Sequence, residues 1–395
     1  MKHLFRILLI LLFISGCKPS EVPLSLQNEI DSIVLQYIPD KREALCNLDM
    51  EILKDRRLLI KGETSIPELK AEILKHLEQS GTGYADSIKV LPDKSETARS
   101  WGLICVSVAN LKKDPSHSSE LVSQTVMGTP VRILKKEGSW LLMQTPDHYL
   151  GWTTASSVSG MDESGFQEWK ESDRLIYTSR TGDILSEGSG KEVVSDVVTG
   201  SILKRISAGR DYFTVELPDG RKGRINRKDA EDFEKWRQTV RPEADKLVSF
   251  AESLTGVSYL WGGTSTKMLD CSGLVKTAYF TGGIILARDA SQQFRYGEEV
   301  DISSSFEALR PGDLLFFGSV NDKGEKRITH TGMYIGNNEF IHASTGRGMV
   351  ANNILDPDAG DYDRYLVSIL QGARRIIGVP SGKGLEHISQ NNWYR

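Results

Sequence analysis

The first part of the chain combines apolar residues at helical spacing with segments in which apolar and polar residues alternate. Helical spacing over residues 28–38 and 66–79 predicts two amphipathic helices. Three strands are expected at residues 47–53, 56–62 and 86–91. Together these segments predict a small α+β domain over residues 25–95.

The next part of the chain repeats itself with a shift of 72 residues and no gap. Residues 120–123 (ELVS) align with residues 192–195 (EVVS). Other aligned pairs are Gly128 and Gly200, Trp140 and Tyr212, Asp147 and Asp219, and Gly151 and Gly223. Each copy contains short strands separated by turn residues, and two copies are too few for a solenoid. The pattern predicts two small β-barrels, over residues 100–160 and 173–232.

The last domain, residues 240–380, follows a helical segment at 232–253 that Pro242 is expected to break. In this domain Cys271 opens a stretch of helical spacing that ends at Gly282 and Gly283. A helix N-terminus carries partial positive charge, which favours a thiolate, the nucleophilic form of cysteine. Cys271 is therefore a candidate nucleophile, and the alternative is a buried structural cysteine.

Two histidines downstream supply a candidate base. His330 and His342 lie in two predicted strands around a three-residue turn at 336–338, with Ile335 opposite Glu339. This register places both histidines on one face, about 7–8 Å apart, whereas a two-residue turn would put them on opposite faces. We expect His330 to be the base and His342 to orient it. A Cys-His-His zinc site and two unrelated histidines are the alternatives.

Four short blocks in the last domain resemble the NlpC/P60 family of cysteine peptidases and stand in that family's order. The blocks are YLWGG (259–263), DCSG (270–273), RPGDL (310–314) and HTGMYIG (330–336). The resemblance implies a papain-like α+β fold, in which a helix bearing Cys271 packs on an antiparallel sheet bearing His330. His342 would be the third, polar member of the catalytic set.

Over residues 100–380 the chain resembles a narrower group, γ-D-glutamyl-L-diamino-acid endopeptidases with two SH3-like domains before the catalytic domain. That group cuts peptidoglycan stem peptides or muropeptides after D-Glu and prefers a free L-Ala amine. The resemblance implies that Asp289 binds this amine and that Ser272 lines its pocket. Asp289 could equally cap a helix, since Gln292 completes a capping box. The group often has Ser after this Asp, where the chain has Ala290.

Aromatic residues complete the implied pocket. By the same resemblance Tyr149 closes it from the first SH3-like domain, and Glu120 is a candidate acidic partner there. Tyr259 and Trp261 would shape the site beside Cys271, with the Tyr259 hydroxyl helping to stabilise an oxyanion. Core packing is the alternative role for Tyr149 and Trp261. The implied mechanism requires no metal or organic cofactor.

The N-terminus has the form of an export signal. Basic residues accompany an apolar run over residues 4–14, which is too short to span a bilayer. Residues 14–17 (ISGC) resemble a lipobox, which makes Cys17 a lipidation candidate; an ordinary secretory signal is the alternative. We expect an exported protein, lipid-anchored to a bacterial membrane in the periplasm or cell envelope. Cys46 and Cys105 would then either pair or stay as buried thiols.

Composition excludes one class of partner. The net charge is -4 and no basic run interleaves with aromatic residues, so nucleic acid is not expected. We expect a monomer. Two further functions compete with the peptidase: a non-catalytic wall-binding lipoprotein that uses its SH3 pair, and an acyltransferase or amidase on a papain-like fold.

Overall fold

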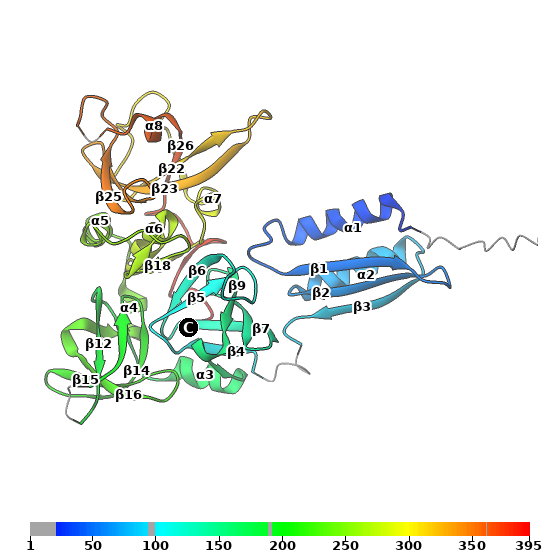
Figure 1. Ribbon diagram of the computed structural model, residues 1–395, viewed down its shortest axis with the longest axis horizontal. Coiled ribbons are helices and arrows are strands. Elements are labelled where there is room, and N and C mark those ends of the chain that lie inside the picture. Colours follow the sequence, from blue (N-terminus) through cyan, green and yellow to red (C-terminus); the bar gives the residue numbers. More distant parts are fainter. Residues whose placement is uncertain (1–20, 94–98, 189–191, 361) are drawn as a thin grey trace, which may run out of the picture. The chain divides into compact units, whose positions relative to one another are not determined.

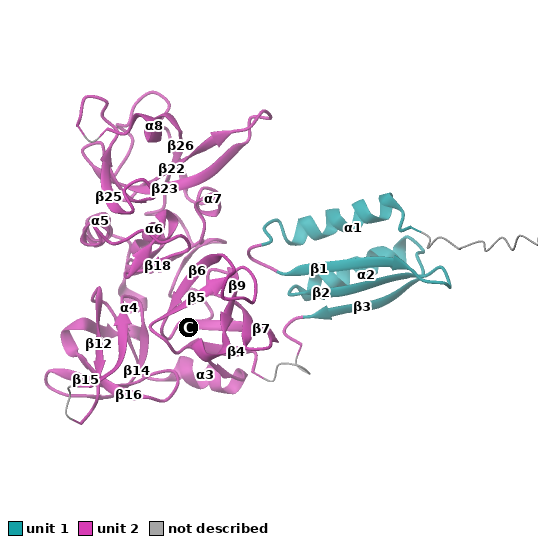
Figure 2. Cartoon of the chain, in the orientation of Figure 1, with its two compact units in different colours: residues 1–41, 45–90 teal, residues 42–44, 91–395 magenta. Residues whose placement is uncertain are grey.

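The computed structural model describes residues 21–93, 99–188, 192–360 and 362–395 (Figure 1). Cys17 and the predicted export signal lie outside the described residues. The chain divides into two compact units, one formed by residues 1–41 and 45–90 and the other by residues 42–44 and 91–395 (Figure 2). Within the described ranges, every helix is too short or too polar to cross a membrane.

The first unit is the predicted small α+β domain. Its elements are α1 (Leu24–Tyr37), β1 (Cys46–Ile52), β2 (Leu58–Thr64), α2 (Pro67–Gln79) and β3 (Tyr84–Val90). The strands form one sheet in the order β1-β2-β3, with β1 antiparallel and β3 parallel to β2. Ile30 of α1 and Leu69, Ile73 and Leu77 of α2 are buried at the predicted helical spacing. All five predicted elements are confirmed.

The second unit begins with two seven-stranded sheets. The first contains β4 (Trp101–Ile104), β5 (Val108–Lys112), β6 (Leu121–Val126), β7 (Pro130–Glu137), β8 (Trp140–Gln144), β9 (Leu150–Thr154) and β10 (Val158–Met161). The second contains β11 (Arg174–Tyr177), β12 (Thr181–Leu185), β13 (Val193–Val198), β14 (Ile202–Ala208), β15 (Tyr212–Glu216), β16 (Lys222–Asn226) and β17 (Ala230–Asp232).

The two sheets have the same topology. Their strand orders are β10-β4-β7-β8-β9-β5-β6 and, read from the other edge, β17-β11-β14-β15-β16-β12-β13. Strands at the same place in the two orders therefore correspond to each other. The repeat found in the sequence places β6 on β13 and β8 on β15, residue for residue. Each copy has its own buried cluster, around Leu111 and Val131 in the first and Leu175 and Val215 in the second. Two SH3-like domains are therefore present in tandem.

Short helices follow the SH3-like domains. They are α3 (Glu163–Glu171), α4 (Phe233–Thr239) and α5 (Ala244–Ser253). Pro242 lies between α4 and α5, so the predicted break is confirmed.

The last domain packs a central helix against an antiparallel sheet. The helices are α6 (Cys271–Thr281), α7 (Ala290–Gln293) and α8 (Arg364–Ser368). The six-stranded sheet has the order β21 (Glu298–Val300), β26 (Leu370–Arg375), β22 (Leu314–Val320), β23 (Lys326–Gly336), β24 (Glu339–Ser344) and β25 (Met349–Ile354). Outside this sheet lie two short pairs, β18 (Thr264–Ser265) with β19 (Met268–Leu269), and β20 (Ile284–Leu286) with β27 (Leu385–His387).

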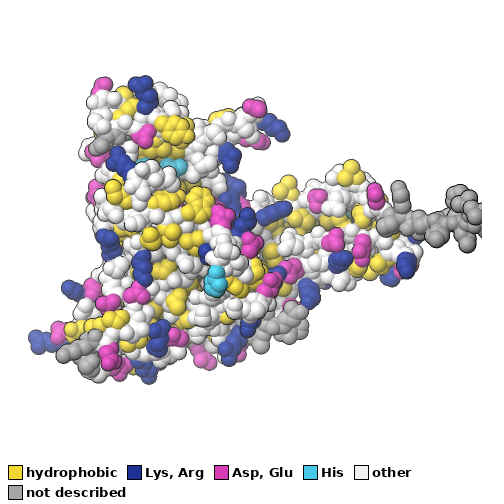
Figure 3. Space-filling model, in the orientation of Figure 1, with side chains coloured by type: hydrophobic (Ala, Val, Ile, Leu, Met, Phe, Trp, Pro, Cys, Tyr) yellow, Lys and Arg dark blue, Asp and Glu magenta, His cyan; other side chains and the backbone are white. Residues whose placement is uncertain are grey.

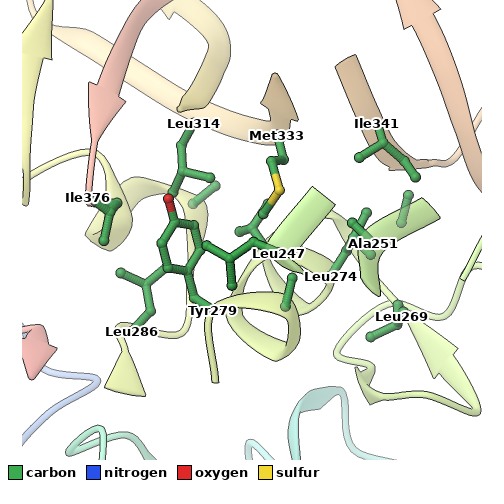
Figure 4. Packing of buried hydrophobic residues seen from close by; sticks show 14 of the residues in the cluster. Leu247, Ala251, Leu269, Leu274, Tyr279, Leu286, Leu314, Met333, Ile341 and Ile376 are labelled. Carbon is green, nitrogen blue, oxygen red and sulfur yellow. The ribbon is translucent and has the colours of Figure 1, made fainter. Parts of the chain in front are cut away.

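Helix α6 is anchored by its apolar side. Leu274 and Tyr279 point into a buried cluster with Leu314 and Met333 of the sheet (Figure 4). The Tyr279 hydroxyl donates to the Gly312 carbonyl at 2.6 Å, so the ring is buried without an unpaired polar atom. This packing fixes the helix that carries Cys271 against the strands that carry the histidines, as the predicted papain-like fold requires.

The turn between β23 and β24 differs from the prediction. It is a two-residue turn of Asn337 and Asn338, both with positive φ (52° and 60°), which favours asparagine. Such a turn alone would separate the histidines, but the register shifts by one residue at Ile335 between Tyr334 and Gly336. Beyond this bulge Met333 pairs with Ile341, which is the predicted register. The turn length was wrong, and the bulge restores the shared face.

Two further features complete the description. Cys46, which is half-buried, and Cys105, which is buried, each carry a free thiol. On the face shown in Figure 3, basic and acidic side chains are interspersed rather than gathered by sign, in keeping with the small net charge of -4.

Candidate active site

Cys271 is held at the first turn of α6 by an ion-paired cap. Asp270 is the N-cap, and its Oδ1 accepts from the Gly273 N–H at 2.7 Å. Arg288, only 1% exposed, donates to both oxygens of Asp270, at 3.1 Å to Oδ1 and 2.6 Å to Oδ2. Arg288 also donates to the Ser272 hydroxyl at 2.8 Å. This buried network fixes the backbone on both sides of the sulfur.

The same surroundings determine the protonation state of the thiol. Burial, and secondly the Asp270 carboxylate, raise the pKa of Cys271 to about 12, although backbone hydrogen bonds from Thr331 and Ser272 oppose this shift. The partial positive charge of the helix N-terminus is therefore not enough to make the resting group a thiolate. The capping carboxylate offsets the helix dipole, and burial penalises the charge. The resting group is a thiol that needs a base.

A chain of hydrogen bonds joins the two histidines to an asparagine. His330 Nε2 lies 2.7 Å from His342 Nδ1, and His342 Nε2 lies 3.0 Å from Asn353 Oδ1. Because Asn353 Oδ1 can only accept, His342 must carry its proton on Nε2 when neutral, which makes its Nδ1 an acceptor. His330 must then carry its proton on Nε2. Its Nδ1 is left unprotonated, as a base requires.

Burial keeps both rings neutral. It lowers the pKa of His330 to about 3, with the neighbouring His342 as the second cause, and it also lowers the pKa of His342. The resting site is thus a neutral thiol with a neutral imidazole, and the assignment of tautomers above applies at neutral pH.

One pocket of about 680 Å³ collects the predicted residues. Its volume lies within the range of small-molecule sites. The predicted residues that line it are Cys271, His330, His342, Tyr259, Ser272, Asp289, Trp261, Tyr149 and Glu120. The SH3-like domain supplies Tyr149 and Glu120, and the catalytic domain supplies the other seven.

The aromatic residues of the pocket lie at its wall. Trp261 is 60% exposed and donates from Nε1 to Glu120 Oε1 at 2.9 Å, so core packing is excluded for it. Tyr149 is 6% exposed, and its hydroxyl lies 3.2 Å from Asp289 Oδ2. Burial raises the pKa of Tyr259, with Cys271 as the second cause, so its phenol keeps its proton.

Asp289 caps a helix and also lines the pocket. It is the N-cap of α7 with a capping box, in which Gln292 Oε1 accepts from the Asp289 N–H at 3.1 Å. Its Oδ2 faces the pocket and receives two donors, the Tyr149 hydroxyl and Arg42 Nη1 at 2.7 Å. Capping and ligand binding are therefore compatible roles. Ala290, at the position where Ser was expected, is buried.

Three residues of the site were not found from the sequence. Asn353 fixes the histidine tautomers, Arg288 forms an ion pair with Asp270, and Arg42 pairs with Asp289 from a segment far earlier in the chain. None belongs to a spacing pattern, and only the position of Arg288 beside Asp289 could have drawn attention to it. Within the described part of the chain, no group of three or more His, Cys, Asp or Glu residues is arranged to hold a metal ion.

Comparisons with known proteins identify two of the domains. The model of the NlpC/P60 family matches residues 256–366, and the model of the bacterial dipeptidyl-peptidase Sh3 domain matches residues 111–158. The Escherichia coli murein DD-endopeptidase MepS/murein LD-carboxypeptidase is 34% identical over 148 residues, which are 37% of this chain and 70% of that protein. The chain belongs to the NlpC/P60 family. It is therefore a peptidase of the hydrolase class.

Relatives of this NlpC/P60 peptidase also share its SH3 region. A Bacillus cereus protein named gamma-D-glutamyl-L-lysine dipeptidyl-peptidase is 29% identical over 236 residues, which are 58% of this chain and 68% of that protein. The crystal structure of an NlpC/P60 family protein from the same species superposes with a TM-score of 0.60 at 25% identity, covering 70% of this chain and 99% of that one. The predicted fold class is confirmed.

Proposed function

We propose that this peptidase hydrolyses the γ-D-glutamyl–diamino-acid bond of peptidoglycan stem peptides that have a free N-terminal L-Ala. The observation that carries the proposal is the chain from His330 to His342 to Asn353, which leaves a basic nitrogen on His330 in the pocket with Cys271. The name of the Bacillus cereus relative supports the choice of bond. A pocket that joins the SH3-like and catalytic domains supports a peptide substrate.

Acylation is the first chemical step. His330 Nδ1 takes the thiol proton of Cys271 as the sulfur attacks the γ-glutamyl carbonyl carbon. The C–N bond then breaks, and His330 returns the proton to the leaving amine of the diamino acid. His342 holds the ring and stabilises the imidazolium that forms between these events. Because the thiol starts neutral, the charge separation occurs only when substrate is bound.

The developing oxyanion needs donors near the sulfur. The first N–H groups of α6 have no partner within the helix, and Cys271 begins that helix. Tyr259 adds a protonated phenol beside Cys271, since its raised pKa keeps the hydroxyl a donor. A water activated by His330 then hydrolyses the thioester and releases the γ-glutamyl acid. Each of these steps uses only groups of the chain, the substrate and one water molecule.

The other end of the substrate lies against the SH3-like side. Asp289 would accept a hydrogen bond from the L-Ala ammonium, with Tyr149 and Ser272 beside it. Glu120 adds a second carboxylate to the pocket wall, held there by Trp261. This position favours stems with a free amine over stems still linked to sugar.

The decisive test is mass spectrometry of L-Ala-γ-D-Glu-diaminopimelate incubated with the full chain in detergent, beside the Cys271→Ala variant. Release of L-Ala-D-Glu by the unmodified protein alone supports both the bond and the nucleophile. If neither protein releases it, the proposed specificity fails. The lysine-containing tripeptide, run in parallel, decides which diamino acid is preferred.

We also propose that Cys17 anchors the exported protein to a membrane. This rests on the sequence of residues 14–17 (ISGC) alone. Metabolic labelling with a fatty acid tests it, because label should enter the unmodified protein and not the Cys17→Ser variant.

A further inference from the structure

We propose that Arg42 is a specificity-determining residue that competes with the substrate's ammonium for Asp289. The inference rests on the proposed function, because it concerns the same amine pocket. Arg42 Nη1 donates to Asp289 Oδ2 at 2.7 Å and to the Ser291 hydroxyl at 3.0 Å. A cationic group of the chain thus occupies the carboxylate oxygen that a substrate ammonium would use.

The segment that carries Arg42 is built into the second unit. Residues 42–44 belong to that unit although the residues on either side belong to the first. The Arg42 carbonyl accepts from the Leu150 N–H at 2.8 Å, directly after Tyr149. The Glu43 carbonyl accepts from Gln144 Nε2 at 2.7 Å. The backbone of residues 42 and 43 is therefore held by hydrogen bonds from β8 and β9, so the position of Arg42 does not depend on its long side chain alone.

Glu43 strengthens the attachment through its side chain. It is 9% exposed, accepts from Gln292 Nε2 at 3.1 Å and pairs with Lys383 Nζ at 3.0 Å. Gln292 belongs to the same capping box that orients Asp289. The attachment of residues 42–44 and the orientation of Asp289 thus share one side chain, which makes the Arg42–Asp289 pair a feature of the folded unit.

Charge explains the consequence for specificity. The side chains of Arg42 and Asp289 are 33% and 28% exposed, so the ion pair is only partly screened by water. An arriving ammonium must displace the guanidinium or share one carboxylate with it, and like charges so close repel each other. A stem with an acylated amine carries no such charge. Arg42 therefore weakens binding of free-amine stems and leaves acylated stems nearly unaffected.

The test compares Arg42→Gln with two controls. Arg42→Lys keeps the charge, and Arg327→Gln removes one positive charge from the wall of the same pocket. KM and kcat are measured for L-Ala-γ-D-Glu-diaminopimelate and its N-acetyl form, using the full chain. Arg42→Gln should lower KM for the free amine about threefold to tenfold and change KM for the acetylated form less than about twofold. Both controls should give smaller changes.

A second arm tests whether the effect passes through Asp289. In an Asp289→Asn background, Arg42→Gln should no longer lower KM, whereas general loosening of the pocket would act in both backgrounds. An unchanged or higher KM for the free amine in Arg42→Gln, with cleavage intact, overturns the inference alone. If neither the unmodified protein nor Arg42→Gln cleaves either peptide, the proposed function fails and this inference with it. Cleavage by Arg42→Gln only would support both.

Discussion

The two halves of the pocket are built in different ways. The chemical half, His330 with His342 and Asn353, comes from three neighbouring strands of one sheet and is neutral at rest. The amine half brings Tyr149 and Arg42 to Asp289, from which they are separated by 140 and 247 residues in the sequence. It contains the ion pair between Arg42 and Asp289. Local strand register thus fixes the chemistry, whereas distant segments fix the recognition.

The two SH3-like copies sharpen this contrast. Tyr149 precedes β9 in the first copy and reaches Asp289, and Arg221 precedes β16 at the equivalent place in the second. Arg221 instead pairs with Asp219 and donates to the Cys105 carbonyl at 3.2 Å. The same position of the SH3-like fold lines the pocket in the first copy, as Tyr149, and contacts the other copy in the second, as Arg221. Topology alone therefore does not assign a role.

The largest expected effect comes from breaking the chemical half. His330→Gln should lower kcat about 10³-fold or more, because the variant lacks the unprotonated His330 Nδ1 that takes the thiol proton. Affinity for the product L-Ala-γ-D-Glu, measured by calorimetry, should stay within about twofold. A parallel loss of affinity would show that the two halves are not separable.

A smaller loss is expected from Asn353, which acts through the histidines. Asn353→Leu should lower kcat about tenfold to a hundredfold, because His342 no longer has an acceptor that fixes its tautomer. Asn353→Asp keeps an acceptor and should retain more activity. The order of the two variants in steady-state assays checks the tautomer argument, and equal losses would contradict it.

The amine half should respond in KM rather than kcat. Tyr149→Phe removes one hydrogen bond to Asp289 and should raise KM for the free-amine tripeptide about threefold to tenfold, with kcat unchanged. The N-acetyl tripeptide should show no such change. Arg221→Met in the second SH3 copy is the matched comparison, and KM should not change there. A fall in kcat for Tyr149→Phe would place Tyr149 in the chemical half.

The smallest effect concerns stability and pH. The pKa of His330 is about 3 in the fold against an ordinary 6.5, so below pH 6.5 the unfolded chain binds a proton that the folded chain does not. The free energy of unfolding should fall by about 1 kcal/mol from pH 6.5 to 5.5 on this account. The free energy of unfolding, measured by denaturant titration at several pH values, should depend less steeply on pH in His330→Gln than in the unmodified protein. Equal slopes would mean that His330 is not held neutral.

Prediction from sequence succeeded where a pattern repeats over short distances. The helix of Cys271, its end at Gly282 and the break at Pro242 follow from apolar spacing and backbone chemistry. The shared face of the histidines was also right, but through a bulge at Ile335 that the sequence did not reveal. The effect of the helix N-terminus on Cys271 was predicted, but not that burial and the Asp270 carboxylate outweigh it and raise the pKa of the thiol.

The sequence by itself determined the family, the papain-like fold, the tandem SH3-like domains and nine of the residues that line the pocket. Apolar periodicity, turn residues and short motifs encode these features locally. Tertiary structure alone decided that Asn353 sets the histidine tautomers, that Arg288 pairs with Asp270, and that Arg42 reaches Asp289. The physical reason is that hydrogen bonds and desolvation depend on which side chains come into contact in the folded protein. A single polar residue belongs to no periodic pattern in the sequence from which such a contact could be predicted.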